Sequence, residues 1–207
     1  MNRDHEDNPP VLVCDLDGTL IKEDLEKCFM AYLIRTKRLK IRALALGLIL
    51  TPVNLVRKSF ERGSIWKVWL TGLPDEEMEE CFNAFFPTWS YSIYEPVLER
   101  VRGFFGRKIL LTGSFERLAV RWLEWSNLRS AFDEVIGCRV HRNSIRVERH
   151  PYGRSKLVCL GNVRPSVSLG NEYADRHVLG ISRTAVCVGG DPKLASALES
   201  HPDRVIV

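Results

Sequence analysis

The sequence predicts an α/β fold in which a parallel sheet is interrupted, after its first strand, by a block of helices. The apolar run Val11–Cys14 is typical of a strand that is buried on both faces. From Pro96 onward, short apolar runs alternate with helical patterns, as in strand–helix–strand units. Between these two parts, residues 23–94 carry helical patterns. Together the three observations indicate a sheet-based core with a helical insertion.

The size and composition of the chain agree with this organisation. It has 207 residues, of which 45% are apolar, enough for one α/β core with a small inserted domain. We expect a flexible tail at residues 1–9, a core made of residues 10–21 and 96–207, and a helical cap at residues 22–95. The six cysteines show no metal-type spacing, so we expect reduced thiols, as in a cytoplasmic protein.

The elements of the first half follow from local signals. Pro10 and Gly18 bound the first strand. Asp24 is a good N-cap for a helix that continues to Leu33, because its apolar residues recur at helical spacing. Two further helices are expected over residues 41–50 and from about residue 54. Pro74 starts another, since acids in its first turn favour the helix N-terminus.

The second half predicts the rest of the core. The expected helices cover residues 97–105, 116–125 and 155–160. The expected strands cover residues 108–114, 134–140, 167–169, 185–188 and 204–207, with a basic, hairpin-like stretch at residues 141–149. Because the carboxyl ends of parallel strands meet at one edge of a sheet, polar residues that follow these strands are expected to lie together.

Two acidic residues, Asp15 and Asp17, directly follow the first strand. Neighbouring carboxylates repel each other unless a cation neutralises them or one is protonated. Mg²⁺ is the usual cation of an oxygen-rich site that also handles phosphate. One carboxylate can attack phosphorus and form an aspartyl-phosphate, while the other protonates the leaving oxygen and later activates water. The pair therefore indicates phosphoryl-transfer chemistry.

Groups that suit a phosphate follow two later elements. Thr112, Gly113 and Ser114 end the second strand, where a hydroxyl and main-chain N–H groups can cradle phosphate oxygens. Lys156 lies at the start of a short helix, where a cation is unfavourable for the helix dipole. We therefore expect Lys156 to have another role, with Arg154 as the alternative.

The segment Asp15-Leu16-Asp17-Gly18-Thr19-Leu20 resembles the first motif of the haloacid dehalogenase (HAD) superfamily. The insertion after it is similar to the helical cap of the phosphoserine-phosphatase-like branch, and the turn Asp191–Leu194 resembles the turn that follows the last core strand in that branch. The resemblance implies a Rossmann-like core, with Asp15 as nucleophile and Asp17 as general acid and base. It also implies that Thr112, or alternatively Ser114, binds the phosphoryl group and that Lys156 neutralises its charge.

The residues after the strand at 167–169 resemble the fourth motif, which supplies metal-binding acids. The family has an Asp in the position where this chain has Asn171, whereas Asp175 matches the second acid of the motif. An amide oxygen can still bind Mg²⁺, and the neighbouring Glu172 is a further candidate. The implied magnesium ligands are Asp15, Asp17 (through its main-chain carbonyl), Asn171, Glu172 and Asp175.

The resemblance implies a Mg²⁺-dependent phosphatase that hydrolyses an organic phosphomonoester through an aspartyl-phosphate. The loss of an acid at Asn171 favours one alternative, a non-catalytic module that binds a phosphorylated ligand or a partner protein. A further alternative is transfer of the phosphoryl group to an acceptor other than water.

A basic segment in the expected cap bears on the substrate. Residues 35–67 contain nine basic residues and one acid, although the whole chain carries a net charge of +4. They flank the apolar run 43–50, which is too short to span a bilayer. This region is expected either to bury the run within the cap, to line a pocket for a lipid or prenyl phosphate, or to lie on an anionic membrane surface. Nucleic acid is not expected as a partner, because aromatic platforms are not interleaved with the basic residues.

Overall fold

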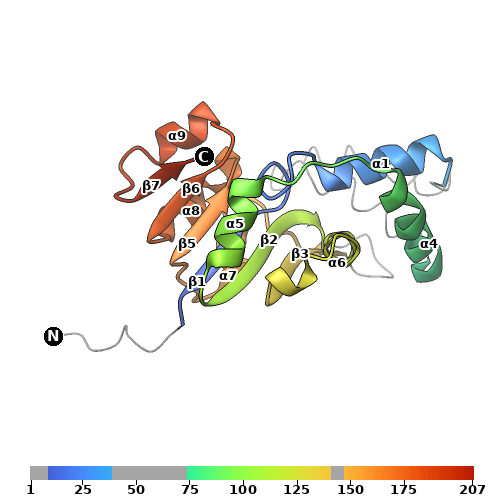
Figure 1. Cartoon of the computed structure of the whole chain (residues 1–207), viewed down its shortest axis with the longest axis horizontal. Helices are drawn as coiled ribbons and strands as arrows, with labels where there is room; N and C mark the ends of the chain where they lie inside the picture. Colours follow the sequence, from blue (N-terminus) through green and yellow to red (C-terminus); the bar gives the residue numbers. More distant parts are fainter. Residues whose placement is uncertain (1–8, 39–73, 141–146) are drawn as a thin grey trace.

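A computed structural model describes residues 9–38, 74–140 and 147–207 (Figure 1). Several sequence predictions lie outside the described residues. These are all but the last residue of the tail at residues 1–9, the helices at 41–50 and from 54, most of the basic segment 35–67, and the greater part of the basic stretch 141–149.

The core is a seven-stranded sheet in the order β4-β3-β2-β1-β5-β6-β7. All neighbouring strands are parallel except β3 and β4. This arrangement confirms the predicted α/β class and its Rossmann-like parallel sheet. The strands are β1 (Val11–Cys14), β2 (Arg107–Phe115), β3 (Glu134–Val140), β4 (Val147–Arg149), β5 (Val167–Gly170), β6 (Thr184–Cys187) and β7 (Arg204–Ile206).

Helices lie on both faces of this sheet and beyond one of its ends. They are α1 (Leu25–Arg35), α4 (Asp75–Phe85), α5 (Glu95–Gly103), α6 (Glu116–Trp125), α7 (Ser155–Leu160), α8 (Arg176–Ile181) and α9 (Pro192–Ala197), with short 3₁₀ turns at Phe86–Thr88, Arg129–Ala131 and Tyr173–Asp175. The sequence did not predict α8 or α9, because each has six residues and less than two turns of periodic pattern.

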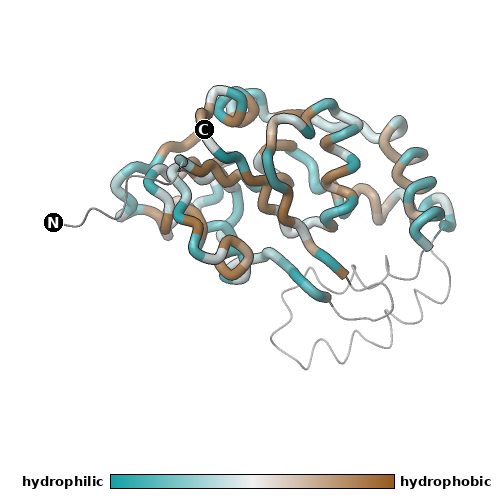
Figure 2. The backbone as a smooth tube through the Cα atoms, turned by 90° about the horizontal axis from the view of Figure 1, so that it is seen from below, coloured by the Kyte–Doolittle hydropathy of each residue, from teal (hydrophilic) through white to brown (hydrophobic). Residues whose placement is uncertain are grey.

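Successive side chains of β1 face opposite sides of the sheet, as expected for a strand. Leu12 and Cys14 belong to one apolar cluster, which includes residues of α5 and α6. Val13 belongs to another, which includes residues of α7 and α8. The strand is therefore buried on both faces, and the strands form the brown interior of Figure 2.

The helices α1 and α4 lie together beyond the β3 side of the sheet (Figure 1). Aromatic side chains join them, since the ring of Phe29 lies 5.1 Å from that of Phe82 and 5.2 Å from that of Phe85. The chain leaves and re-enters the core at one place: the N–H of Lys22 donates to the carbonyl of Ser92 at 3.0 Å. The proposed cap, residues 22–95, begins at this pairing and ends three residues after it.

The α4 helix is also tied to α6 of the core. Arg117 forms ion pairs with Asp75 and, at 2.9 Å, with Glu79. At the end of α4, the Phe86 ring stacks on Trp125 with a centroid distance of 5.6 Å. The described part of the insertion therefore shares both an apolar cluster and ion pairs with the core.

Candidate active site

Asp15 lies at the carboxyl end of β1, in the middle of the sheet. Its N–H donates to the carbonyl of Leu169 at 3.0 Å, which extends the β1–β5 ladder up to the site. The side chain is only 8% exposed. One carboxylate oxygen, Oδ1, accepts from the ammonium of Lys156 at 2.7 Å, and Oδ2 accepts from the hydroxyl of Thr19 at 3.3 Å. Both oxygens of the expected nucleophile are thus held in place.

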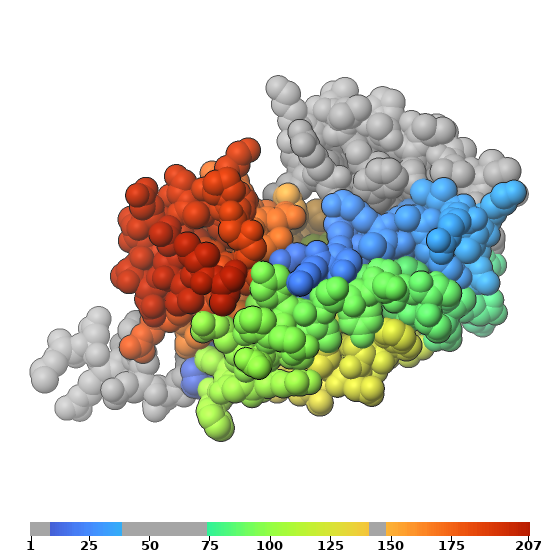
Figure 3. Space-filling view, turned by 45° about the horizontal axis from the view of Figure 1, so that its top comes forward, coloured from blue at the N-terminus to red at the C-terminus, as the bar shows by residue number. Residues whose placement is uncertain are grey.

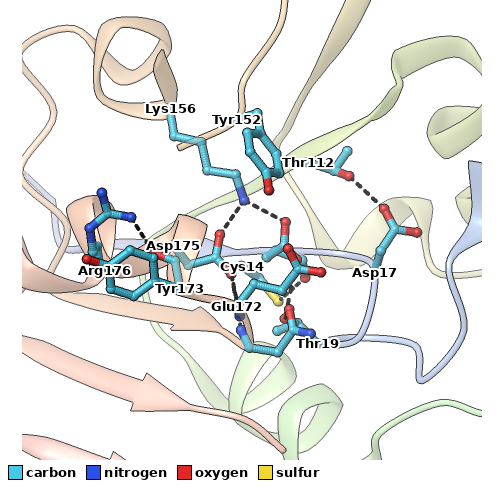
Figure 4. Close-up of polar contacts among 12 residues, drawn as sticks. Cys14, Asp17, Thr19, Thr112, Tyr152, Lys156, Glu172, Tyr173, Asp175 and Arg176 are labelled. Atoms are coloured by element: carbon cyan, nitrogen blue, oxygen red, sulfur yellow. Dashed lines mark hydrogen bonds and ion pairs between the residues drawn. The ribbon is translucent and has the colours of Figure 1, made fainter. Parts of the chain in front are cut away.

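Lys156 is buried between two carboxylates, as Figure 4 shows. Its Nζ lies 2.7 Å from Asp15 Oδ1 and 2.6 Å from Asp175 Oδ1. Burial by itself lowers the pKa of Lys156, but the two carboxylates outweigh it and raise that pKa well above its ordinary value. The other oxygen of Asp175 accepts the N–H groups of Asn171 and Glu172, both at 3.1 Å. Asp175 therefore fixes both the charged Lys156 and the loop after β5.

The site holds more negative than positive charge. Burial raises the pKa of Asp15 to about 8, with Lys156 opposing the shift and Asp175 and Asp17 adding to it. At the inner end of the pocket, the carboxylates of Asp15, Asp17 and Asp175 lie around the ammonium of Lys156. A cation or a proton is required to balance such a group of charges.

Asp17 occupies a separate set of hydrogen bonds. Its Oδ1 accepts the N–H of Leu25 at 2.7 Å, at the first residue of α1. Its Oδ2 accepts from the hydroxyls of Ser114 at 2.6 Å and Thr112 at 3.2 Å (Figure 4). Burial and the charge of Asp24 raise the pKa of Asp17 to about 6, although these hydrogen bonds oppose the shift. A carboxyl group with this pKa is suited to exchanging protons near neutral pH.

Replacing Asp17 with Asn is expected to stabilise the metal-free protein above pH 6. The pKa of Asp17 is about 6 in the folded protein, above the ordinary value of 3.8. The free energy of unfolding of the wild-type protein therefore falls as the pH rises from about 3.8 to about 6, and it stays lower above pH 6. The amide can keep the bond from Leu25 and donate to the hydroxyls of Thr112 and Ser114, which also accept. Urea unfolding with a chelator should show a gain of up to about 3 kcal/mol at pH 7.5 that shrinks toward pH 4. A gain that is independent of pH, or a loss at pH 7.5, contradicts this origin of the shift.

The end of β2 departs from regular pairing at the residues expected to bind phosphate. The β2–β3 register shifts between Leu111 and Phe115, and such irregularities redirect side chains near active sites. Gly113 and Ser114 line the pocket, whereas Thr112 is fully buried and its hydroxyl contacts Asp17. Thus all three residues lie at the site, but Gly113 and Ser114 face the open volume.

Asn171 lies across the site from Lys156, against the turn after β1. Its Oδ1 accepts from the Thr19 hydroxyl at 3.0 Å, so one hydroxyl contacts both Asn171 and Asp15. Gly18 has a φ of +72°, and a Cβ there would lie 2.1 Å from Asn171 Nδ2. Glycine is therefore required at this turn both for its conformation and for the close approach of Asn171.

The oxygen groups at this edge fit Mg²⁺ in their chemistry. Within residues 9–38, 74–140 and 147–207, no group of three or more His, Cys, Asp or Glu side chains is arranged to hold a metal ion. The oxygen donors at this edge are the carboxylates of Asp15, Glu172 and Asp175, the amide oxygen of Asn171 and the main-chain carbonyl of Asp17, and the side chains of Asp15, Asn171 and Asp175 also accept hydrogen bonds. Mg²⁺ commonly binds one or two carboxylates and keeps several waters, which suits such an incomplete set.

A pocket of about 540 Å³ opens from these residues toward α1. Asp15, Asp17 and Lys156 line its inner end, and Met30 and Ile34 of α1 line it further out. In Figure 3 a hollow is visible between the blue α1 region and the orange-to-red C-terminal part. The described active-site groups are therefore accessible from the insertion side.

Sequence reasoning missed some residues that shape the site. Thr19 was named only as part of the segment Asp15–Leu20, yet its hydroxyl contacts both Asp15 and Asn171. Glu26 of α1 accepts the N–H of Phe115 at 2.9 Å and so attaches the helix to the end of β2. A helical-wheel count of the polar positions after Asp24, which was correctly predicted as the N-cap, is the signal that could have drawn attention to Glu26. In contrast, Arg154 is exposed, whereas Lys156 is buried at the site.

Several solved structures have a similar fold, and one of them matches this chain over nearly the whole length of both proteins. A protein with unknown function from Bordetella pertussis Tohama I has a TM-score of 0.72 and 16% identity, covering 97% of this chain and 99% of that chain. A phosphoserine phosphatase with a phospho-aspartyl intermediate analogue has a TM-score of 0.53 and 12% identity, covering 96% and 93%. A substrate-bound phosphoserine phosphatase has a TM-score of 0.52 and 13% identity, covering 97% and 94%. At these identities the likeness concerns the fold.

The sequence comparisons address the family itself. A search of curated proteins gives no significant match. The haloacid dehalogenase-like hydrolase family matches residues 12–192, which is most of the chain and contains every motif residue from Asp15 to Asp175. The match confirms the family that these motifs indicated, and the chain belongs to the haloacid dehalogenase-like hydrolases.

Proposed function

We propose that this hydrolase is a Mg²⁺-dependent phosphatase that cleaves an organic phosphomonoester through a phosphoryl group carried by Asp15. The observation that carries the proposal is the buried ammonium of Lys156, 2.7 Å from Asp15 and 2.6 Å from Asp175. A cation held beside a nucleophilic carboxylate allows that carboxylate to remain ionised and neutralises charge on the transferring group.

In the proposed reaction, a carboxylate oxygen of Asp15 attacks phosphorus and the bond to the leaving oxygen breaks. Asp17 gives its proton to that oxygen, for which its pKa of about 6 is suitable. Asp17 then accepts a proton from water as the water attacks phosphorus, which frees inorganic phosphate and restores Asp15. Gly113 and Ser114, which line the pocket, are the proposed contacts for phosphate oxygens, with Thr112 supporting Asp17.

The proposed magnesium ligands are Asp15, the main-chain carbonyl of Asp17, and Asn171 or Glu172. Asp175 is also a proposed ligand, and its carboxylate holds Lys156 and the loop after β5 as well. When bound, Mg²⁺ supplies positive charge that offsets the carboxylates and the phosphate.

Replacing Asn171 with Asp is expected to tighten Mg²⁺ binding by about tenfold or more, because affinity follows the number of charged ligands. The new carboxylate also adds repulsion to Asp15 in the metal-free state, so the melting temperature without metal should fall. Thermal melts during a MgCl₂ titration measure both effects, since binding to the folded state raises the melting temperature. Asn83→Asp, the same change at an exposed position of α4, is the control and should leave the titration unchanged. An unchanged titration for Asn171→Asp would remove Asn171 from the proposed ligand set.

A second candidate function is supported by Asn171 itself. A site with one carboxylate fewer than the family pattern suits a non-catalytic module that binds a phosphorylated ligand or a partner protein. In that case the phosphate contacts and Lys156 retain their binding role, but Asp15 carries no phosphoryl group.

The finer proposals concern substrate and location. We propose a small phosphorylated substrate, with a lipid or prenyl phosphate as one class, in a cytoplasmic protein. The basic segment of residues 35–67 suggests a peripheral contact with the anionic inner face of a membrane, a proposal that rests on its composition. Among the described helices, none has the length and apolarity to cross a membrane.

The proposed function is tested by hydrolysis of a generic aryl phosphate and a broad phosphomonoester panel, with Mg²⁺ and with a chelator. Release of inorganic phosphate that requires Mg²⁺ supports the phosphatase. If no member of the panel is hydrolysed, while the protein still binds inorganic phosphate, the non-catalytic module replaces it.

A further inference from the structure

We propose that the face of α1 carrying Met30, Ala31 and Ile34 binds the leaving group of the substrate, and that this group is an uncharged, apolar alcohol. This inference rests on the proposed phosphatase function and specifies its substrate class from residues that the structure describes. It is independent of the basic segment at residues 39–67.

The α1 helix begins at the catalytic residues and runs outward along the pocket. The N–H of Leu25, its first residue, donates to Asp17 at 2.7 Å. Lys27, Met30, Ala31 and Ile34 all line the pocket, and their spacing of three, four and seven residues puts them on one face. With a rise of 1.5 Å per residue, this face extends for about 10 Å. When the phosphorus of a substrate lies next to Asp15, the leaving group of that substrate therefore lies along a wall that is apolar beyond Lys27.

The opposite face of α1 packs against the rest of the protein, and on the pocket face Met30 belongs to the same buried apolar cluster. Phe29 and Leu33 are fully buried, and Phe29 packs on the aromatic side chains of α4. In contrast, Ile34 is 53% exposed. Together with Met30 and Ala31, this exposed isoleucine gives the pocket an apolar wall that is available to an apolar ligand.

A second wall of the pocket is aromatic. His150 and Tyr152, in the loop before α7, both line the pocket, and their rings stack at 5.8 Å with an interplanar angle of 6°. Tyr152 is on the same side of the site as Lys156 in Figure 4 and is 36% exposed. A rigid aromatic pair can contact an alkyl or planar group at little cost in conformational entropy.

The charges along the described pocket walls disfavour an anionic leaving group. Outside the inner end, the charged side chains that line the pocket are Asp24, Glu26, Lys27 and Glu172. Lys27 is paired with Asp24 at 2.7 Å, so three carboxylates and one paired ammonium face the ligand. A carboxylate on the leaving group would meet repulsion there without an unpaired cation among the described lining residues. Together with the apolar face of α1, these charges favour an apolar alcohol without a carboxylate over an amino acid or hydroxy acid.

The test compares decyl phosphate, methyl phosphate and O-phosphoserine as substrates. Each methylene that is buried contributes about 0.8 kcal/mol, so a few of them give at least a tenfold higher kcat/KM for decyl phosphate than for the other two. Equal or higher kcat/KM for O-phosphoserine overturns the inference, even if the proposed phosphatase activity is present.

Variants of Ile34 test the surface itself. Ile34→Ser is expected to lower the ratio of kcat/KM for decyl phosphate to that for methyl phosphate about fivefold. Ile206→Ser is the matched control, because Ile206 is 57% exposed and is absent from the described pocket lining. Ile34→Arg should shift preference from decyl phosphate toward the phosphate ester of 10-hydroxydecanoate, whose terminal carboxylate it can pair. If Ile34→Ser behaves like Ile206→Ser, the inference is overturned.

A binding measurement separates failure of the inference from failure of the proposed function. Decylphosphonate and methylphosphonate cannot be hydrolysed, and their affinities can be measured by calorimetry in a protein that proves inactive. Tighter binding of decylphosphonate, reduced by Ile34→Ser, supports the apolar subsite although the phosphatase proposal has failed. Equal affinities for the two phosphonates overturn the subsite.

Discussion

Asp15→Asn is expected to abolish hydrolysis of every phosphomonoester that the wild-type protein cleaves, with a loss of about 10⁴-fold or more in kcat. The amide cannot carry the phosphoryl group, and removal of a nucleophile has an effect of this order. The substitution also removes one partner of Lys156, whereas the contact of Lys156 with Asp175 at 2.6 Å can remain. Steady-state release of inorganic phosphate at saturating Mg²⁺ measures the loss.

Two control measurements for this variant are its secondary structure and its affinity for inorganic phosphate. The Asn side chain has nearly the same shape as Asp, so far-ultraviolet circular dichroism should not change and inorganic phosphate should still bind. An Asp15→Asn protein that is folded and retains more than about one per cent of the wild-type rate is incompatible with Asp15 as the nucleophile.

Lys156→Met is expected to lower kcat/KM by about 10²- to 10³-fold, the usual effect of removing one preorganised charge from a reacting anion. Its ammonium contacts Asp15 and Asp175 at once, so both carboxylates lose their partner. The loss of one member of a buried ion pair also destabilises a protein by about 3–5 kcal/mol. The assay should therefore be run well below the melting temperature of the variant, with saturating Mg²⁺.

Arg154→Met tests which of two cations, Lys156 or Arg154, neutralises the phosphoryl group, a choice that the sequence left open. Arg154 is exposed and precedes α7 by one residue, whereas Lys156 is buried, so the Arg154 variant should keep activity within about twofold. A large loss in Arg154→Met together with a small one in Lys156→Met would reverse the assignment.

Much of the core could be predicted because its signals are local. The apolar run Val11–Cys14 has one interpretation in a chain that alternates strands and helices, and the structure has it as a central strand. The helices α8 and α9 escaped prediction because six residues are too few for a periodic pattern. Strand order was not predicted either, since it depends on packing between residues far apart in the sequence.

The candidate site divides in a similar way. Strand ends drew attention to Asp15, Asp17 and Thr112, because in a parallel sheet these ends share an edge. The pairing of Asp175 with Lys156 could not be read from spacing, since it joins α7 to the 3₁₀ turn after β5 through side-chain geometry. The pocket face of α1 was also missed, because both faces of this helix carry apolar residues and one-dimensional periodicity does not tell which is buried.

The role assigned to Asn171 illustrates a limit of motif reasoning. The sequence indicates a missing carboxylate, but the structure adds that Asn171 Oδ1 and Asp15 Oδ2 contact the same hydroxyl of Thr19. Two oxygens that lie so near to one hydroxyl are suitable to share a cation as well. This geometry supports the proposal that the amide serves as a magnesium ligand.

The most direct test of the central claim is to trap the phosphoryl group on Asp15. A phosphomonoester that the protein hydrolyses is labelled with radioactive phosphorus, mixed with protein and Mg²⁺, and quenched in acid during turnover. Hydroxylamine-sensitive label should lie on the peptide containing Asp15 and be absent from Asp15→Asn. With an aryl phosphate, whose leaving oxygen needs little protonation, the label should also increase in Asp17→Asn because attack by water is slowed. Turnover without protein-bound label, or label on another residue, would contradict phosphoryl transfer to Asp15.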